Sequence, residues 1–283
     1  MELGRMLSRH LPSLALALAV STLAVTLSGA LQLGQPAREP HRGLSGLVAV
    51  IALITLAGAW NHSRTWLRTV ALGCVVSVIA LGGLGISMTN SPWLIVLHAC
   101  LSHIFFAGTV ALVVGTSPAW SRVPEMLADD GSPSLRTLGK VAPVAVMAQI
   151  FLGAIYRHLS LPVWPHLVGS LLVGCLLLYT GMVVLESETP HPDLRRAAQV
   201  LLGVTVAQMA FGLGAFLGRV MAGDGLPPEW WMNGSRTIHV VTGSLTLGAA
   251  VSCALQVFYH VRPGADAQPR GIDNKNVEKS VVA

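Results

Sequence analysis

Four histidines are placed where they could act together as ligands of a metal-containing cofactor. Each stands at or near the start of an even-numbered apolar segment: His41, His98, His166 and His239. An imidazole inside a bilayer is energetically costly and rare, so it points to a functional role. Two imidazoles that face each other across a four-helix bundle can hold a haem between them. We therefore expect two pairs, His41 with His98 and His166 with His239, although any one of them alone could simply lie among lipid headgroups or bond a carbonyl.

The residues around these histidines suit a flat, anionic cofactor. Small residues follow within about one turn and would let a macrocycle approach the backbone: Ser45 and Gly46, Ser102, Gly169 and Ser170, and Gly243 and Ser244. Arg42 is adjacent to His41, and Arg236 precedes His239 by about one helical turn on the same face. Guanidinium groups pair with carboxylates, which haem carries as propionates. Each arginine taken alone could equally snorkel to the membrane interface.

The other histidines are weaker candidates. His103 lies five positions after His98, about 140° around the helix, so both cannot face one haem, and His103 remains the alternative ligand. His158 follows Arg157 in a predicted outer loop. A zinc or copper site would need ligands clustered on neighbouring turns with cysteine or carboxylate help, and no such cluster is evident in the sequence. The rest are expected to be solvated at cytoplasmic helix ends or in a cytoplasmic loop: His10, His62, His260 and His191.

The composition requires lipid as the solvent. The chain has 283 residues, of which 53% are hydrophobic and 11% charged, and its mean hydropathy is +0.64. A soluble domain carries about 25% charged residues. Stretches of about twenty apolar residues can span the hydrocarbon core as helices. Eight such stretches predict an all-α membrane protein with eight transmembrane helices: 11–33, 43–60, 68–88, 93–115, 140–156, 163–185, 197–219 and 238–259.

The basic residues predict orientation rather than a nucleic-acid partner. If the N-terminus is cytoplasmic, only five of the 18 Lys and Arg residues fall in outer segments: Arg38, Arg42, Arg157, Arg219 and Arg236. This positive-inside bias predicts that both termini lie in the cytoplasm. We expect the chain to span the inner membrane of the cell. The first stretch also resembles a signal peptide, but its apolar run is long, and we expect it to remain uncleaved. The four cysteines fall inside apolar runs and are expected to be packing residues.

An internal repeat divides the chain into two halves. Gln149 precedes Gly153 by four residues, as Gln208 precedes Gly212, and each pair lies in the outer half of a predicted helix. This predicts two four-helix bundles related by internal duplication, in residues 1–125 and 136–262. Residues 263–283 are polar and are expected to form a disordered cytoplasmic tail.

Taken in order, these motifs resemble the haem A synthase family, eight-helix membrane enzymes that convert haem O to haem A. The resemblance covers roughly residues 11–260. It rests on five motifs: His41-Arg42, His98, the segment from Gln149 through Gly153 to Arg157-His158, Trp164-Pro165-His166, and Gln208 and Gly212 followed by His239-Val-Val-Thr-Gly243. The family's glutamate one turn before the first histidine has no counterpart at position 38, which is Arg; the nearby acid is Glu39, two residues before His41.

The resemblance implies that the two halves of the chain bind haem for different purposes. His166 and His239 would hold a haem b, with Arg157 and Arg236 as further cofactor-binding residues. His41 and His98 would ligate the substrate haem O, whose ring methyl group is oxidised to a formyl group for cytochrome oxidase assembly. The implied partners are the farnesyltransferase that makes haem O and an electron donor of unspecified identity. Two other functions remain open: a dihaem b-type electron-transfer protein without oxygenase activity, and a transporter or assembly factor, whose expected broken helices and midplane charges are missing.

Overall fold

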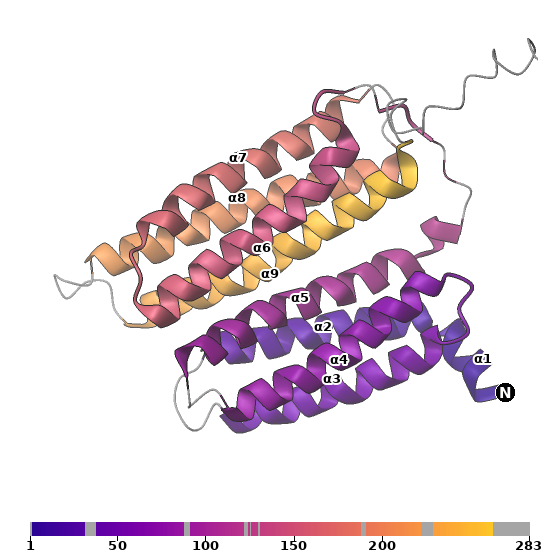
Figure 1. Cartoon of the computed structure of the whole chain (residues 1–283), viewed down its shortest axis with the longest axis horizontal. Helices are drawn as coiled ribbons and strands as arrows, with labels where there is room; N and C mark the ends of the chain where they lie inside the picture. Colours follow the sequence, from indigo (N-terminus) through magenta and orange to yellow (C-terminus); the bar gives the residue numbers. More distant parts are fainter. Residues whose placement is uncertain are drawn as a thin grey trace, which may run out of the picture.

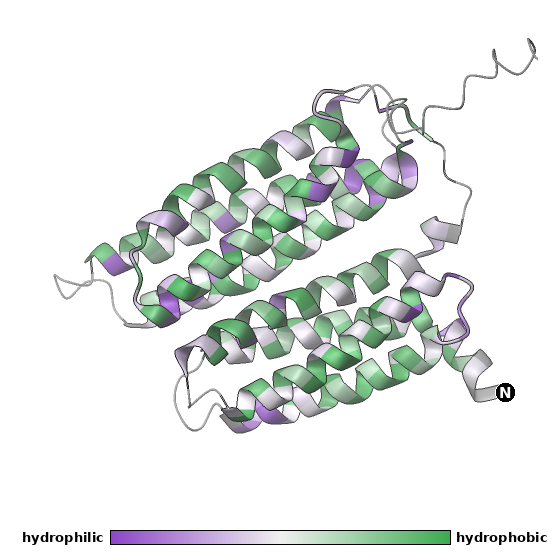
Figure 2. Ribbon diagram, in the orientation of Figure 1, coloured by the Kyte–Doolittle hydropathy of each residue, from purple (hydrophilic) through white to green (hydrophobic). Residues whose placement is uncertain are grey.

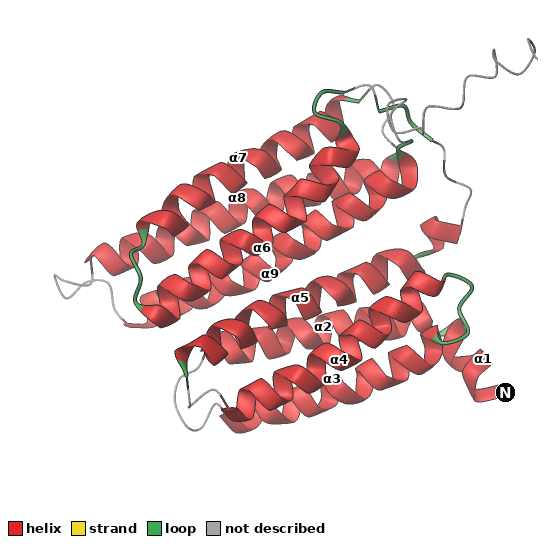
Figure 3. Ribbon diagram, in the orientation of Figure 1, coloured by secondary structure: helices red, strands yellow, loops and turns green. Residues whose placement is uncertain are grey.

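The computed structural model describes residues 2–31, 38–87, 91–121, 124, 126–129, 131–187, 191–221 and 229–262, and within them the chain is helical with no strand (Figure 3). Eight long helices follow a short one, which the sequence did not predict. In chain order they are α1 (Glu2–Arg9), α2 (Leu11–Leu31), α3 (Arg38–Ala59), α4 (Thr65–Ser87), α5 (Pro92–Thr116), α6 (Leu135–Leu159), α7 (Trp164–Glu186), α8 (Pro192–Met221) and α9 (Glu229–His260). The predicted tail, 263–283, lies outside the described residues.

The long helices form two four-helix bundles that lie side by side (Figure 1). The first contains α2 to α5 and the second α6 to α9, and each has its own core of buried apolar side chains. The bundles meet where α5 packs against α6 and α9, and where α2 packs against α9. Consecutive long helices run in opposite directions. We call the end where α3, α5, α7 and α9 begin the histidine end, and the other end, which carries the connection from α5 to α6, the linker end.

The outer surface is apolar enough for lipid. All eight long helices have the length and hydropathy of membrane spans. Large hydrophobic side chains are exposed along them, including Ile79, Val144, Leu172 and Val206, each more than half exposed. Hydrophobic residues cover most of the length of the long helices (Figure 2). Burial of these side chains in lipid is favourable, and α-helices satisfy their own backbone hydrogen bonds there. The predicted eight-helix membrane fold is confirmed.

Four helices, α5, α6, α8 and α9, extend at both ends beyond the apolar stretches that predicted them. The stretch at 140–156 lies within α6 (Leu135–Leu159), and the one at 238–259 lies within α9 (Glu229–His260). Hydropathy detects only the part in hydrocarbon, whereas helical hydrogen bonding continues into polar residues at each end. Ser134 caps α6 by accepting from the backbone N–H of Thr137, and the Asp129 carboxylate accepts from Leu135 and Arg136 at 2.8 and 3.1 Å. Such capping stabilises a helix start outside the apolar window.

Candidate functional site

At the histidine end, each of the four predicted ligands lies against a glycine of the preceding helix. A Cβ added to Gly153 would be 2.9 Å from His166 Cε1, and one added to Gly212 would be 2.8 Å from His239 Cε1. In the first bundle the corresponding distances are 3.1 Å from Gly29 to His41 and 3.7 Å from Gly85 to His98. The same contact thus recurs in all four helix pairs. In the second bundle it is close enough that only glycine leaves room for the ring.

The four rings also meet equivalent backbone carbonyls. Each interacts with the carbonyl of the residue four positions before its glycine: Val25 for His41, Leu81 for His98, Gln149 for His166 and Gln208 for His239. None of these four contacts has hydrogen-bonding geometry: Nδ1 of His98 and of His239 is buried without a hydrogen-bond partner, and Nδ1 of His41 and of His166 lies against a side chain instead.

The second bundle brings His166 and His239 together. Their ring centroids are 6.2 Å apart, and the ring planes lie at 83° to each other. Tyr156 stacks beside His166, with centroids 6.2 Å apart and planes at 11°. The pair predicted from the sequence is therefore a neighbouring pair in space.

Two glutamines support this pair from the preceding helices. The Gln149 amide nitrogen is 2.9 Å from His166 Nδ1 and donates to the His166 carbonyl at 2.7 Å. Thr242 donates a short hydrogen bond to Gln208 Oε1. In the first bundle the positions equivalent to these glutamines are Val25 and Leu81. A glutamine on the preceding helix is thus a feature of the second bundle, where Gln149 contacts the His166 ring directly and Gln208 bonds Thr242, three residues after His239.

The first bundle places His41 and His98 close enough to interact electrostatically. Ser28 forms a hydrogen bond of 2.9 Å with His41 Nδ1. Glu39 does not face this pair: its carboxylate forms an exposed ion pair with Arg42 at 3.1 Å. An exposed pair of this kind contributes little to stability, so Arg42 keeps its freedom to pair with another anion. The side chain of Arg38 is outside the described residues.

Three arginines gather at the histidine end of the second bundle. Arg157 and Arg236 lie near enough for their charges to repel, and the Arg219 guanidinium lies 5.1 Å from the centre of the Tyr156 ring. None of the three has an acidic partner among the described residues. Like charges held together favour a bound anion. Arg219 was counted in the charge bias but not predicted for the site, because only the fold brings the end of α8 beside Tyr156.

His103 faces the second bundle, and a Cβ added to Gly243 of α9 would lie 4.0 Å from His103 Nε2. It is buried, its Nδ1 lies 2.7 Å from the carbonyl of Ala99, and it also interacts with the carbonyl of Val240 in α9. Its ring therefore lies at the contact between the two bundles. Of the two alternatives in α5, the arrangement pairs His98, not His103, with His41.

Haem fits the residues around His166 and His239. Two metal–nitrogen bonds of about 2 Å each, plus the ring radii, separate the centroids of two axial imidazoles by about 6–6.5 Å, and the observed separation is 6.2 Å. The unpartnered Nδ1 of His239 and Oε1 of Gln149 are buried polar atoms, which normally have partners. The arginines supply cationic groups suited to carboxylates.

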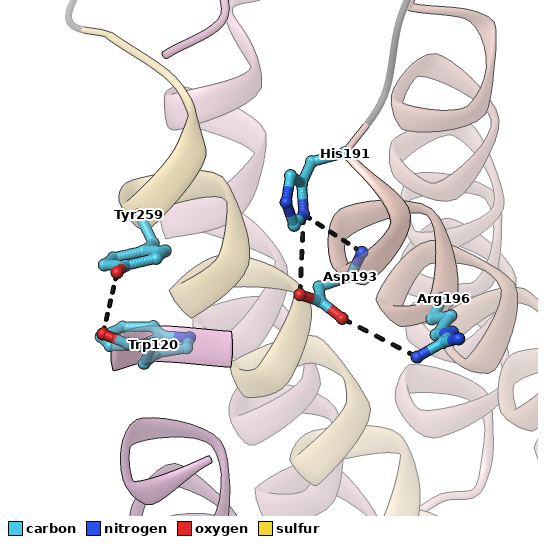
Figure 4. Close-up of polar contacts among 5 residues, drawn as sticks. All are labelled: Trp120, His191, Asp193, Arg196 and Tyr259. Carbon is cyan, nitrogen blue, oxygen red and sulfur yellow. Dashed lines mark hydrogen bonds and ion pairs between the residues drawn. The ribbon is translucent and has the colours of Figure 1, made fainter. Parts of the chain in front are cut away.

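A second cluster lies at the linker end, where the sequence predicted solvated histidines. His10 is exposed as expected, but His260 is 2% exposed, so the prediction for His260 is wrong. His260 stacks on His191, with ring centroids 4.0 Å apart, and Asp193 completes a group whose potential ligand atoms all lie within 4.8 Å of one another. Figure 4 shows His191 and Asp193 at the start of α8. The short spacing of His191 and Asp193 could have indicated two ligands of one site. The third member, His260, lies far along the chain and could not be assigned to it from the sequence.

His62, also at the linker end, is half-buried between α3 and α4. Burial lowers the pKa of its imidazole, and the nearby Arg64 cation acts in the same direction. Its Nδ1 accepts a hydrogen bond from the backbone N–H of Arg64 at 3.1 Å. His62 is thus occupied in a helix connection rather than in either cluster.

No protein-family model matches the chain, and no curated protein matches it significantly.

Proposed function

We propose that this membrane protein is a haem-dependent oxidoreductase of the haem A synthase type, which oxidises a ring methyl group of haem O to a formyl group. The observation that carries the proposal is the histidine–glycine contact repeated in all four helix pairs. A glycine beneath each imidazole fixes the ring against the neighbouring helix and keeps the space in front of it clear. A bis-histidine site in each bundle is the simplest use of this arrangement.

The two bundles have different roles in this proposal. In the second bundle, His166 and His239 hold a permanent haem b, because Gln149 and Gln208 orient the helices around the rings and three arginines bind the propionates. Outer contacts of this kind tighten metal ligation. In the first bundle, His41 and His98 have apolar neighbours at the equivalent positions, so ligation is weaker. Weaker ligation suits a substrate that enters as haem O and leaves as haem A.

The protein residues contribute binding, orientation and exclusion of water. The haem iron supplies the redox chemistry when it is bound. Arg42 holds a propionate at the first bundle by exchanging its ion pair with Glu39. Helices α2 to α5 surround the first pair with apolar side chains, which keep the reacting methyl group out of water.

The proposal includes location and partners. The chain spans the inner membrane with its N-terminus and the end of α9 on the cytoplasmic side, so the histidine end faces outward. Its partners are a haem O-producing farnesyltransferase and an electron donor, and lipid surrounds both bundles. The duplicated halves then present both haems to the same face of the membrane.

Spectroscopy and pigment extraction of the purified protein, co-expressed with a haem O source, test the proposal. The wild-type protein should show a low-spin haem b spectrum, and its cells should contain haem A. His166→Leu and His239→Leu should each abolish the low-spin α-band, since losing one axial ligand leaves the iron high-spin or poorly retained. His158→Leu is the matched control, because His158 lies at the same end and no glycine in the part of the chain that the structure describes lies against its ring. An unchanged low-spin spectrum in both ligand variants would overturn the assignment.

A dihaem electron-transfer protein is the second candidate. It is favoured by one observation: Glu39, the acid nearest the first pair in the sequence, is exposed and paired with Arg42. Two haems in the purified protein without any haem A in the co-expressing cells would select this function. Absence of haem from the purified protein would exclude both.

A further inference from the structure

We propose that His191, Asp193 and His260 form a binding site for one Zn²⁺ ion at the linker end of the second bundle. The proposal is independent of haem, because this cluster lies at the opposite end of α9 from His239. His239 and His260 are 21 positions apart, which is about 31 Å along a helix.

The donor set is one that zinc uses. Two imidazoles and one carboxylate, with water in the fourth position, match the three-ligand zinc sites of proteins. Ligand atoms around a tetrahedral zinc ion are about 3.4 Å apart for bonds of about 2.1 Å. His191 Nδ1 and Asp193 Oδ2 are 3.6 Å apart, and the three potential ligand atoms lie within 4.8 Å of one another. Zinc binding would require the two stacked imidazoles to rotate toward the ion and would replace the hydrogen bond of 3.3 Å from the Asp193 backbone N–H to His191 Nδ1.

The surroundings restrict how these groups move. The His191 and Asp193 side chains are only 23% and 22% exposed, and His260 is buried. The second carboxylate oxygen, Asp193 Oδ1, lies 3.9 Å from the Arg196 guanidinium. Figure 4 draws this ion pair and the two contacts of Asp193 with His191. A charged neighbour that holds the other oxygen of a ligating carboxylate orients it toward the metal.

The backbone of His260 is fixed by the segment that joins the two bundles. Leu127 N–H donates to the His260 carbonyl at 2.7 Å, and Arg262 N–H donates to the Leu127 carbonyl at 2.9 Å. The Arg136 side chain donates to the Val261 carbonyl at 2.8 Å. A zinc ion bound here would therefore connect the start of α8 to the end of α9 and to the linker. Binding to this assembled arrangement would stabilise the second bundle.

The test is zinc binding by the full-length protein in detergent, purified through a tag without histidine and stripped with a chelator. Zinc is then added alone, and bound metal is measured by mass spectrometry and titration calorimetry. We expect one zinc ion per chain at this site and a higher unfolding temperature when it is bound. His191→Ala and Asp193→Asn should each weaken this binding by about 100-fold, since each removes one of three protein ligands.

His10→Ala is the control, because His10 is an exposed histidine at the same end. Zinc bound by the haem-site histidines or by cysteines would remain in every variant. The difference in bound zinc between the wild type and each ligand variant therefore measures binding by His191, Asp193 and His260. The ligand substitutions are at partly exposed side chains, and retained helicity by circular dichroism will show that the variants fold. Equal zinc binding in wild type, His191→Ala and Asp193→Asn, or no binding by the folded wild type, would overturn the proposal and leave a stacked histidine pair with an ion-paired aspartate.

Discussion

At the residue scale, the glycine beneath each histidine is the feature most open to test. Gly212→Ala would place a Cβ 2.8 Å from His239 Cε1, which forces the ring to move. We expect this variant to lose or shift the low-spin haem b spectrum. Gly214→Ala in the same helix is the control, because an added Cβ there meets nothing within 4 Å, and alanine favours the helix by up to about 1 kcal/mol. Identical spectra in the two variants would show that the contact does not position the ligand.

The two histidines of α5 should behave differently. His98→Leu removes a ring that faces His41, so it should stop haem A formation while leaving the haem b spectrum nearly intact. His103 contacts α9 instead, so His103→Leu should still yield haem A. Pigment analysis of cells that co-express each variant with a haem O source measures the difference. Loss of product in His103→Leu but not in His98→Leu would reverse the ligand assignment.

At the element scale, the linker end of α9 is held by contacts from distant segments. Tyr259 stacks on Trp120 with ring centroids 4.3 Å apart, and its hydroxyl donates to the Trp120 carbonyl at 2.9 Å (Figure 4). Arg64 in turn donates to the carbonyls of Gly115 and Trp120. These bonds attach the end of the first bundle to the end of the second.

Tyr259→Phe should lower the free energy of unfolding by about 0.5–1.5 kcal/mol, the usual contribution of one hydrogen bond. Tyr259→Ala should cost more, because it also removes the stacked ring. Thermal unfolding in detergent measures both, with the exposed Tyr179→Phe as the control. If Tyr259→Phe and Tyr179→Phe have equal effects, the hydroxyl does not stabilise the linker end.

At the scale of the whole molecule, the orientation proposed from the charge bias is directly measurable. Reporter fusions after residues 125 and 190 should read cytoplasmic, and fusions near 90 and 225 should read external. The physical reason is that Lys and Arg resist translocation, so the basic end of each helix pair stays inside. An external signal at 125 or 190 would contradict this orientation. It would also mean that His191, Asp193 and His260 lie on the outer side of the membrane.

The sequence by itself determined the number of spans, their order and the common end of the four histidines. These properties depend on local hydropathy and on the alternation of consecutive spans, and the eight spans are confirmed by the helices α2 to α9. It also marked Gln149 with Gly153 and Gln208 with Gly212, because a repeated spacing is visible without a fold. The helix ends were less predictable, since polar capping residues such as Ser134 carry no apolar signal.

Only the tertiary structure decided which side chains meet across helices. It turned His98 toward His41 and His103 toward α9, a choice set by how α5 rotates between its neighbours. It also buried His260 against His191, although the sequence alone predicts that a histidine at a polar helix end is solvated. The residues involved are separated by tens of positions in the chain, so their contact depends on helix packing, and no local pattern encodes it.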